Sequence, residues 1–544
     1  MKLKESKFKN ELTIKYIVPE RIVYFENAAD CECLLEDRPR QAVLADIKSA
    51  VIKEGGTVLI DFGAEFQGGI DITVQNVSSD SGKLHIVFGE SVSEAMSGLG
   101  EKNSGNDHAI RDMVVSVGNW SRQRYGNTGF RFVRIQAVGG DVSVARVSGV
   151  FEYRDIEYKG KFKCNDDLLN QIWDTGAYTV HLNMQEYLWD GIKRDRLVWI
   201  GDMHPEIMTI ATVFGYNEVV PKSLDLIRDI TPPDKWMNNI PSYTMQWIRN
   251  QYLWYCCTAD FTYLSEQKEY LYASIDNIVS VAAEHGADGF EDKFIDWSAR
   301  DTKWERGGFC AVLVLTLNDA SELCKILGDK ERAKKCADTA AKIGKTKAEY
   351  SGSKQTAALA ALAEMGDAVK INEEIIKKDG AKGLSAFLGC YVLFAMAKAG
   401  DISGALDMIR EYWGGMLKFG ATTFWEDFDI AWTENAAGID ELVPEGKKDI
   451  HGDFGKYCYR NFRHSLCHGW ASGATAFLSR YIAGIEMLEP GFKRVRINPN
   501  PCGLKYFEIA MPTPHGNIEV KYRNGDFTVN APFGVEIVNG KERQ

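Results

Sequence analysis

The hydrophobic pattern at the start of the chain alternates with a period of two. Residues 56–63 lead into residues 68–74, and residues 84–89 and 130–135 repeat the alternation. Clusters of Gly, Asn and Ser separate these runs, as turns separate short strands. Because many short strands at this spacing are typical of a β-sandwich, we predict one for residues 1–155.

Near residue 165 the period changes to that of a helix. Residues 165–173 begin with a capping residue, and helical spacing then continues in about a dozen segments to about residue 482. The clearest segments are 242–264, 266–284, 308–328, 330–344, 384–399 and 401–413. A long run of helices without strands predicts a domain of paired helices over residues 156–484. Periodicity alone does not distinguish a closed toroid from an open helical repeat.

Strand-like alternation returns in residues 485–544, at 492–499, 516–522 and 527–530, and predicts a small C-terminal β-sheet domain. The expected fold class is therefore multidomain α+β. Three long segments without periodicity interrupt the helical region. Such segments inside a compact domain are usually functional; here they are residues 185–202, 286–306 and 418–464.

The first long loop contains an unusual density of charge. It includes Asp190-Gly-Ile-Lys-Arg194-Asp195-Arg196-Leu-Val-Trp199-Ile-Gly-Asp202. A surface helix with salt bridges is the simple alternative. Buried charges are costly unless they are paired, so the segment fits a cleft better, with carboxylates held by arginines and an aromatic side chain facing a ligand.

Two further segments pair polar groups with tryptophan. Residues 420–429 contain Trp425 followed by Glu426, with Asp427 and Asp429 as near alternatives, and residues 465–473 contain His468. Two carboxylate clusters, each beside a Trp, suit glycoside hydrolysis. One acid protonates the leaving oxygen, the other acts as nucleophile or activates water, and indole rings face the sugar.

These motifs resemble those of the α-L-rhamnosidases of glycoside hydrolase family 78. The matches are Asp190 to Asp202, Gly420 to Glu426, and His468. The resemblance implies an (α/α)6 barrel over 156–484, preceded by a β-sandwich that buttresses it. It also implies exo-acting, inverting hydrolysis of terminal α-L-rhamnose from plant glycosides or pectic oligosaccharides.

The resemblance also assigns roles. Asp195 is the implied general acid and Glu426 the general base, about 6.5–9.5 Å apart in an inverting enzyme. Longer members of the family usually have Glu where this chain has Asp195, which is one methylene shorter. The implied substrate-binding residues are Asp190, Arg194, Trp199, Asp202, Trp247, Asp296, Trp297, Trp425 and His468.

Each of these roles has a structural alternative. Asp190 and Asp202 could simply anchor Arg194 or Arg196, Trp247 could be a core residue, and His468 could be a core histidine with satisfied hydrogen bonds. Two other functions stay open as well: a different glycoside hydrolase or lyase on the same fold, and a rhamnose-binding protein that has lost catalysis.

Composition limits the classes of partner that this chain is expected to bind. The net charge of −12 and the pI near 5.4 argue against nucleic acid and anionic membranes. No run of about 18 apolar residues is present, so no transmembrane helix is expected. The oligomeric state is open between a monomer and a homodimer.

Targeting and metal signals are weak. The charged start of the chain does not resemble a signal peptide, and the 12 cysteines are irregularly spaced. We therefore expect reduced thiols in a cytoplasmic enzyme. The acidic segment 288–292 lacks the spacing of a calcium loop, so we predict no cofactor and no metal in the active site.

Overall fold

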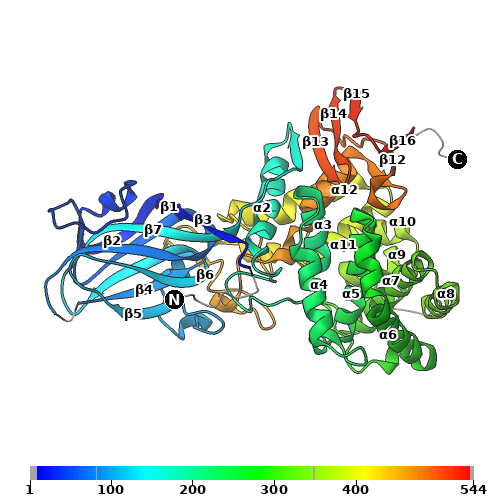
Figure 1. Ribbon diagram of the computed structural model, residues 1–544, viewed down its shortest axis with the longest axis horizontal. Helices are drawn as coiled ribbons and strands as arrows, with labels where there is room; N and C mark the ends of the chain where they lie inside the picture. The colour runs from blue at the N-terminus through cyan, green and yellow to red at the C-terminus, as the bar shows by residue number, and fades with distance from the viewer. Residues whose placement is uncertain (1–8, 81, 347–348, 540–544) are drawn as a thin grey trace, which may run out of the picture.

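The structure is a computed structural model that describes residues 9–80, 82–346 and 349–539. A strand-rich domain lies at one end of the molecule and a helical domain at the other, with a small group of strands on top of the helices (Figure 1). The predicted order of strands, helices and strands along the chain is therefore confirmed.

Seven strands of the described residues form the N-terminal sheet domain. They belong to one hydrogen-bonded sheet with the order β1-β7-β3-β6-β4-β5, and β2 pairs with β3. Their pairing is antiparallel throughout. The strands are β1 (Leu12–Ile17), β2 (Arg21–Ala29), β3 (Ala50–Val77), β4 (Lys83–Gly89), β5 (Asp112–Ser116), β6 (Ser121–Val138) and β7 (Val142–Arg154). The two-layer form of a sandwich stays a prediction.

The long strand β3 organises this domain. Its register against β6 shifts between Asp61 and Phe66, and such irregularities bend a strand and let it change partners. Aromatic side chains fill the core beside the shift: the ring of Phe130 lies 4.5 Å from that of Phe66 and 4.7 Å from that of Phe88. A short helix, α1 (Val92–Met96), follows β4 and is capped by the hydroxyl of Ser91, which accepts from the Glu94 amide.

Twelve α-helices occupy the described part of the helical domain, joined by loops and short 3-10 or π-helical turns. They are α2 (Asp167–Asn183), α3 (Met203–Val213), α4 (Val219–Ile230), α5 (Pro241–Thr258), α6 (Phe261–His285), α7 (Glu305–Ile326), α8 (Lys330–Gly344), α9 (Lys354–Leu362), α10 (Ala368–Ile371), α11 (Gly389–Lys398), α12 (Ile402–Lys418) and α13 (Gly473–Phe477). The expected absence of strands is wrong in the long loop after α12, where the two-residue strands β9 (Ala436–Ala437) and β10 (Lys448–Asp449) pair in parallel.

Caps decide where these helices begin. The cap of α2 is Asp166, whose carboxylate accepts from two amides, while Asn165 instead accepts from the amides of Lys505 and Tyr506. The predicted helix over 242–264 is interrupted at Ala259, which has a left-handed φ of 53°. Asp260 then caps α6, so the break falls earlier than periodicity placed it.

Two small sheets close the chain. One contains β11 (Ile485–Met487), β12 (Arg494–Ile497) and β16 (Glu536–Asn539). The other has the order β15-β14-β13-β8 and contains β8 (Lys161–Cys164), β13 (Tyr506–Thr513), β14 (Gly516–Arg523) and β15 (Asp526–Asn530). The predicted boundaries assign residues 161–164 to the helical domain, but this strand pairs with β13. A strand between β7 and α2 therefore completes the C-terminal sheet.

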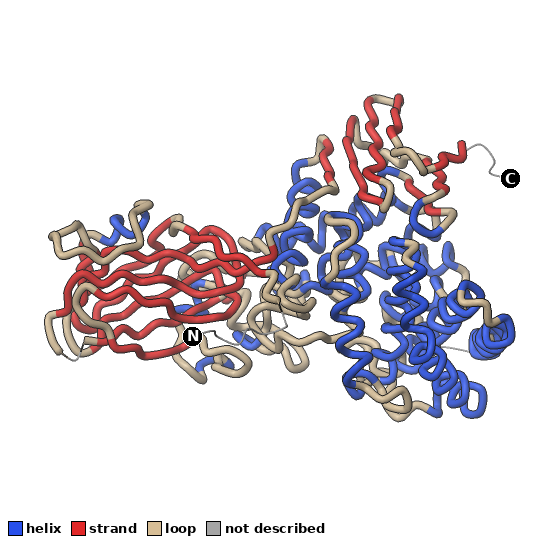
Figure 2. Tube along the Cα trace, in the orientation of Figure 1, coloured by secondary structure: helices blue, strands red, loops and turns tan. Residues whose placement is uncertain are grey.

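Loops gather where the sheet domain meets the helices (Figure 2). Main-chain amides of the sheet domain donate hydrogen bonds across this boundary: Gly129 N donates to Ile192 O (2.9 Å), and Glu65 N donates to the side-chain hydroxyl Thr422 Oγ1 (3.0 Å). The guanidinium of Arg131 also donates to Gly420 O (3.0 Å). The sheet domain thus contacts the segments that carry both acid motifs.

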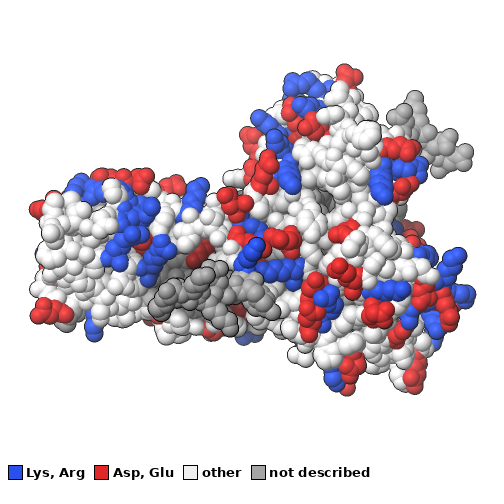
Figure 3. Space-filling model, in the orientation of Figure 1, with Lys and Arg blue, Asp and Glu red and all other residues white. Residues whose placement is uncertain are grey.

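Three features of the described residues bear on charge, membrane spans and cysteines. Acidic and basic side chains are interspersed over the face drawn in Figure 3. Among the described residues, no helix combines the length and the apolar character that a membrane span needs. All twelve cysteines are free thiols.

Candidate active site

The loop between α2 and α3 presents Asp195 on a tight turn. Asp195 and Arg196 both have left-handed backbone conformations, with φ of 57° and 53°. Such angles are uncommon outside glycine, although Asp tolerates them better than most residues. Trp199 Nε1 donates to Asp195 Oδ2 (3.1 Å) and fixes the carboxyl. This strained turn gives the shorter acid a defined position on the cavity wall.

Glu426 lies in the segment after α12 and is held from the opposite side. Its main-chain amide donates to Ser465 O (3.0 Å), and the Ser465 amide donates to Glu426 Oε2 (3.1 Å). The indole of Trp470 donates to Glu426 O (2.9 Å). The carboxyl of Glu426 is therefore fixed by a loop that comes about forty residues later in the chain.

One guanidinium contacts both candidate catalytic acids. Arg194 Nη2 donates to Glu426 Oε1, and Arg194 Nη1 lies 3.9 Å from Asp195 Oδ1. Burial raises the pKa of Glu426 above its usual range, while Arg194 and the Ser465 amide oppose that rise. Arg194 thus favours the ionised form of Glu426, which is the form that a general base requires.

Asp190, Asp202 and His468 form a buried polar group beside these acids. The hydroxyl of Tyr243 donates to Asp202 Oδ1 (2.9 Å). His468 Nε2 lies 3.7 Å from Asp190 Oδ2 and 3.5 Å from Glu426 Oε1. Burial and neighbouring carboxylates raise the pKa of both aspartates well above the usual value, and burial lowers the pKa of His468 well below it. These shifts favour the uncharged forms of all three groups, and uncharged carboxyl and imidazole groups can both donate and accept, as sugar hydroxyls require.

These groups surround a cavity of about 290 Å³. Eight predicted residues line it: Asp190, Arg194, Asp195, Trp199, Asp202, Trp297, Glu426 and His468. A larger hollow of about 620 Å³ lies between α3, α5 and the C-terminal strands and contains none of the predicted residues. We place the chemistry in the smaller cavity, because only there do the two acid motifs meet.

Three predicted residues do not line this cavity. Trp247 is fully buried, and its indole donates to Leu224 O (3.1 Å) between α4 and α6, so it is a core residue. Trp425 is also buried; it packs on Phe428 and does not line the cavity, although its neighbour Glu426 does. Asp296 accepts from two serine hydroxyls and lines a small recess next to the cavity.

Sequence reasoning missed other cavity residues. Tyr243 lies one helical turn before Trp247 on α5 and contacts Asp202, but the sequence analysis predicted Trp247 as the site residue of this helix. The remaining cavity residues, none of which was among the predicted site residues, are Ile240, Asp292, Phe294, Arg300, Cys458, Tyr459, Arg463 and Trp470. The aromatic content of the 454–470 segment was the available signal for Tyr459 and Trp470.

The sheet domain also reaches the site. His108 Nε2 lies 3.4 Å from Asp195 Oδ1, and Arg196 donates to the carbonyl of His108 (3.0 Å). Asp107 pairs with Arg463, a cavity residue. The loop between α1 and β5 therefore forms part of the cavity rim on the side of Asp195.

Comparison with known proteins supports the resemblance drawn from the motifs. The family model described as the bacterial alpha-L-rhamnosidase 6 hairpin glycosidase domain matches residues 157–462, more than half of the chain. The chain belongs to the bacterial α-L-rhamnosidase family. The model of the C-terminal domain of bacterial alpha-L-rhamnosidases matches residues 484–538.

Relatives of this rhamnosidase-family chain are distant in sequence. An α-L-rhamnosidase of Formosa agariphila is 23% identical over 192 residues, which cover 34% of this chain and 20% of the relative. A family 78 rhamnosidase of Bacillus sp. GL1 has a TM-score of 0.74 at 21% identity and covers 94% of this chain. The chain spans about half of that structure's length, 55%.

Two solved structures of similar fold contain the sugar. A rhamnosidase from Klebsiella oxytoca with rhamnose bound has a TM-score of 0.67 at 20% identity, covering 87% of this chain and 96% of its own. The Streptomyces avermitilis α-L-rhamnosidase complexed with L-rhamnose has a TM-score of 0.73 at 17% identity, covering 98% and 50%. At these identities the likeness establishes the fold.

Proposed function

We propose that this protein is an inverting exo-α-L-rhamnosidase. The observation that carries the proposal is the contact of one guanidinium, that of Arg194, with both Asp195 and Glu426 at the wall of one cavity. In this mechanism Asp195 protonates the glycosidic oxygen while Glu426 removes a proton from the attacking water. The relatives that contain rhamnose support the choice of sugar.

The size of the cavity supports an exo mode of action. A volume of about 290 Å³ is at the lower end of ligand-binding cavities, which suits one terminal sugar ring. Asp190, Asp202 and His468 would bind the hydroxyls of the ring, and Trp199 and Trp297 would face its carbon atoms. A plant glycoside or pectic oligosaccharide is the substrate class that we propose.

We also propose that the twelve α-helices pair into an (α/α)6 barrel. The description of the matching family model as a six-hairpin domain supports this arrangement. The loops at one end of the barrel would then carry both acid motifs, which is where cavity residues from α5 and from the long loops meet.

The test is hydrolysis of an aryl α-L-rhamnoside by the wild type, Glu426→Gln and Asp195→Asn. Loss of Glu426 should lower kcat by about 10²–10⁴-fold, the typical contribution of general base catalysis. Asp195→Asn should matter less for an aryl substrate, whose good leaving group needs little acid help, and more for an alkyl rhamnoside. If both variants keep near-wild-type turnover on both substrates, the assignment is wrong.

The same assay separates the alternatives. Calorimetric binding of L-rhamnose without turnover by the wild type would indicate a binding protein, and gain of turnover in Asp195→Glu would identify the site as a degenerate one. Activity on another aryl glycoside, with none on rhamnosides, would show that the enzyme recognises a sugar other than rhamnose.

A further inference from the structure

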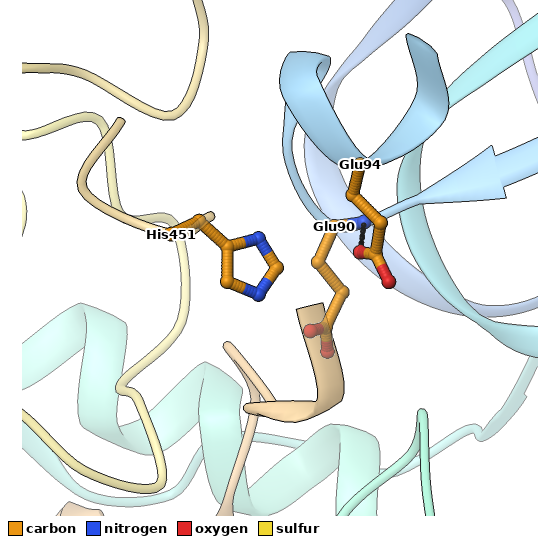
Figure 4. A group of neighbouring side chains, drawn as sticks. All are labelled: Glu90, Glu94 and His451. Atoms are coloured by element: carbon orange, nitrogen blue, oxygen red, sulfur yellow. Dashed lines mark hydrogen bonds between the residues drawn. The ribbon is translucent and has the colours of Figure 1, made fainter. Parts of the chain in front are cut away.

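Three buried ionisable side chains meet across the boundary between the sheet domain and the helical domain. Glu90 directly follows β4, Glu94 lies on α1, and His451 lies in the long loop after α12 (Figure 4). All three are at most 1% exposed. Their candidate ligand atoms lie within 4.8 Å of one another, a spacing that would also suit a metal ion.

A lysine of the first acid motif already supplies the positive charge there. Lys193 Nζ lies 3.1 Å from Glu90 Oε2 and 2.9 Å from Glu94 Oε1, and it donates to two main-chain carbonyls. His451 Nδ1 lies 2.8 Å from Ser91 Oγ, and its Nε2 lies 3.0 Å from a carbonyl oxygen. The acids and both imidazole nitrogens therefore have protein partners, and the cluster is an ion-pair network between domains.

This network leads directly to Glu426. The amide of Leu466 donates to Glu90 Oε2 (2.7 Å), and the hydroxyl of Ser465 donates to Glu90 Oε1 (3.1 Å). The amide of the same Ser465 donates to Glu426 Oε2, and Ser465 O accepts from the Glu426 amide. Ser465 thus holds Glu426 on one side, while Glu90 holds Ser465 and its neighbour Leu466 on the other.

A second connection starts from the lysine. Lys193 immediately precedes Arg194, the residue whose guanidinium contacts Glu426 and Asp195. Glu90 anchors Lys193 through their ion pair. Both groups that favour the ionised form of Glu426, Arg194 and the Ser465 amide, are therefore placed by chain segments that Glu90 contacts.

We propose that Glu90 is a positioning residue for hydrolysis, which acts from the sheet domain through the Ser465–Leu466 segment on Glu426. The inference rests on the proposed function, in which Glu426 is the general base. It gives the sheet domain a part in catalysis beyond support of the helices, because the base keeps its place only while that domain is docked.

Glu90→Gln tests the proposal. It removes the charge that Lys193 and two donors share, so Ser465 should move relative to Glu426. Since a misplacement of about 1 Å can cost about a hundredfold in rate, we expect kcat to fall about 10- to 100-fold. KM should change little, because Asp190 and Asp202 keep their partners. The acidic limb of kcat/KM should move to higher pH as the Ser465 amide bond weakens, which a loss of stability alone does not produce.

Lys102→Met is the matched control. It breaks another ion pair between the domains, that of Lys102 Nζ with Asp453 Oδ1 (2.6 Å), without contact to Ser465. Its kcat and its acidic limb should equal those of the wild type. Ser465→Ala keeps the Ser465 amide but removes the hydroxyl, which bonds to Glu90 and to the main chain of Cys467, and it should shift both quantities in the same direction by a smaller amount. It serves as the test if Glu90→Gln does not fold.

Hydrogen exchange of residues 464–468 provides a measurement that needs no turnover. Exchange should accelerate in Glu90→Gln and stay unchanged in Lys102→Met. If the wild type does not hydrolyse rhamnosides, the proposed function fails while exchange still decides whether Glu90 holds this segment. Unchanged exchange, or an unchanged kcat and acidic limb in an active Glu90→Gln enzyme, would overturn the inference.

Discussion

Removal of the Arg194 guanidinium should change the pH dependence of the enzyme as well as its rate. The side chains of Arg194 and Glu426 are 6% and 1% exposed, so water screens their contact little. An arginine beside a buried carboxyl lowers its pKa by about 1–3. Burial already raises the pKa of Glu426, and without Arg194 it should rise further by that amount.

The expected result for Arg194→Gln follows from the higher pKa of Glu426. The base is active only when ionised, so the acidic limb of kcat/KM should move up by about 1–3 on the pH scale. At a fixed pH below the limb, kcat/KM should fall about tenfold for each whole pH step by which the limb moves. On the alkaline side the rate should recover partly, because only the orientation of the two acids is then lost.

The assay is kcat/KM for an aryl α-L-rhamnoside from about pH 4 to about pH 9, with thermal unfolding as the check on folding. Arg196→Gln is the control, because Arg196 donates to Asn127 and His108 and does not contact Glu426. Its limb should stay in place. A uniform loss of rate in Arg194→Gln, with the limb unmoved, would refute the view that Arg194 sets the ionisation of the base.

Three further predictions concern single residues. Trp247→Phe should leave KM for rhamnosides unchanged and lower the free energy of unfolding by about 1–3 kcal/mol, because it removes a core ring and the bond to Leu224 O. A raised KM without loss of stability would indicate that Trp247 binds the substrate after all. Burial raises the pKa of Asp427 to about 7. The folded state therefore binds more protons than the unfolded state between about pH 4 and 7, and it loses stability as pH rises through that window. Asp427→Asn should remove this loss, at most about 4 kcal/mol, in unfolding measured at both ends of the window, and an unchanged pH dependence of stability would contradict the prediction. Tyr243→Phe should raise KM about 2- to 10-fold and lower the free energy of unfolding by about 1–3 kcal/mol, because it removes the buried bond to Asp202; an unaltered KM would contradict the view that Tyr243 orients that carboxyl for the substrate.

Much of the fold follows from local patterns. The change of period near residue 165 located the start of α2 closely, and the segment 330–344 has the bounds of α8, because an acidic cap and a regular apolar face mark it. Ala259 shows the limit. A left-handed alanine that ends a helix has no signal in composition, so two helices were divided at the wrong place.

The candidate site was likewise predictable only in part. Dense charges beside Trp199 and Glu426 identified the two motifs, since few other roles need such residue types together. Packing decides which aromatic side chain of α5 faces the cavity. Trp247 was predicted to do so, but Tyr243 lines the cavity instead. The role of Glu90 could not be predicted from the sequence. Glu90 stands in a strand-rich segment far from Ser465 in sequence, and only the docking of two domains brings the two residues together.

The stereochemistry of the first product tests the central claim most directly. Proton NMR of the sugar released by the wild type from an aryl α-L-rhamnoside, recorded before mutarotation, reports which anomer forms first. If Glu426 activates a water on the face opposite to the leaving group, β-L-rhamnose should appear first and α-L-rhamnose only later. Initial formation of α-L-rhamnose, or no release of rhamnose at all, would contradict the account.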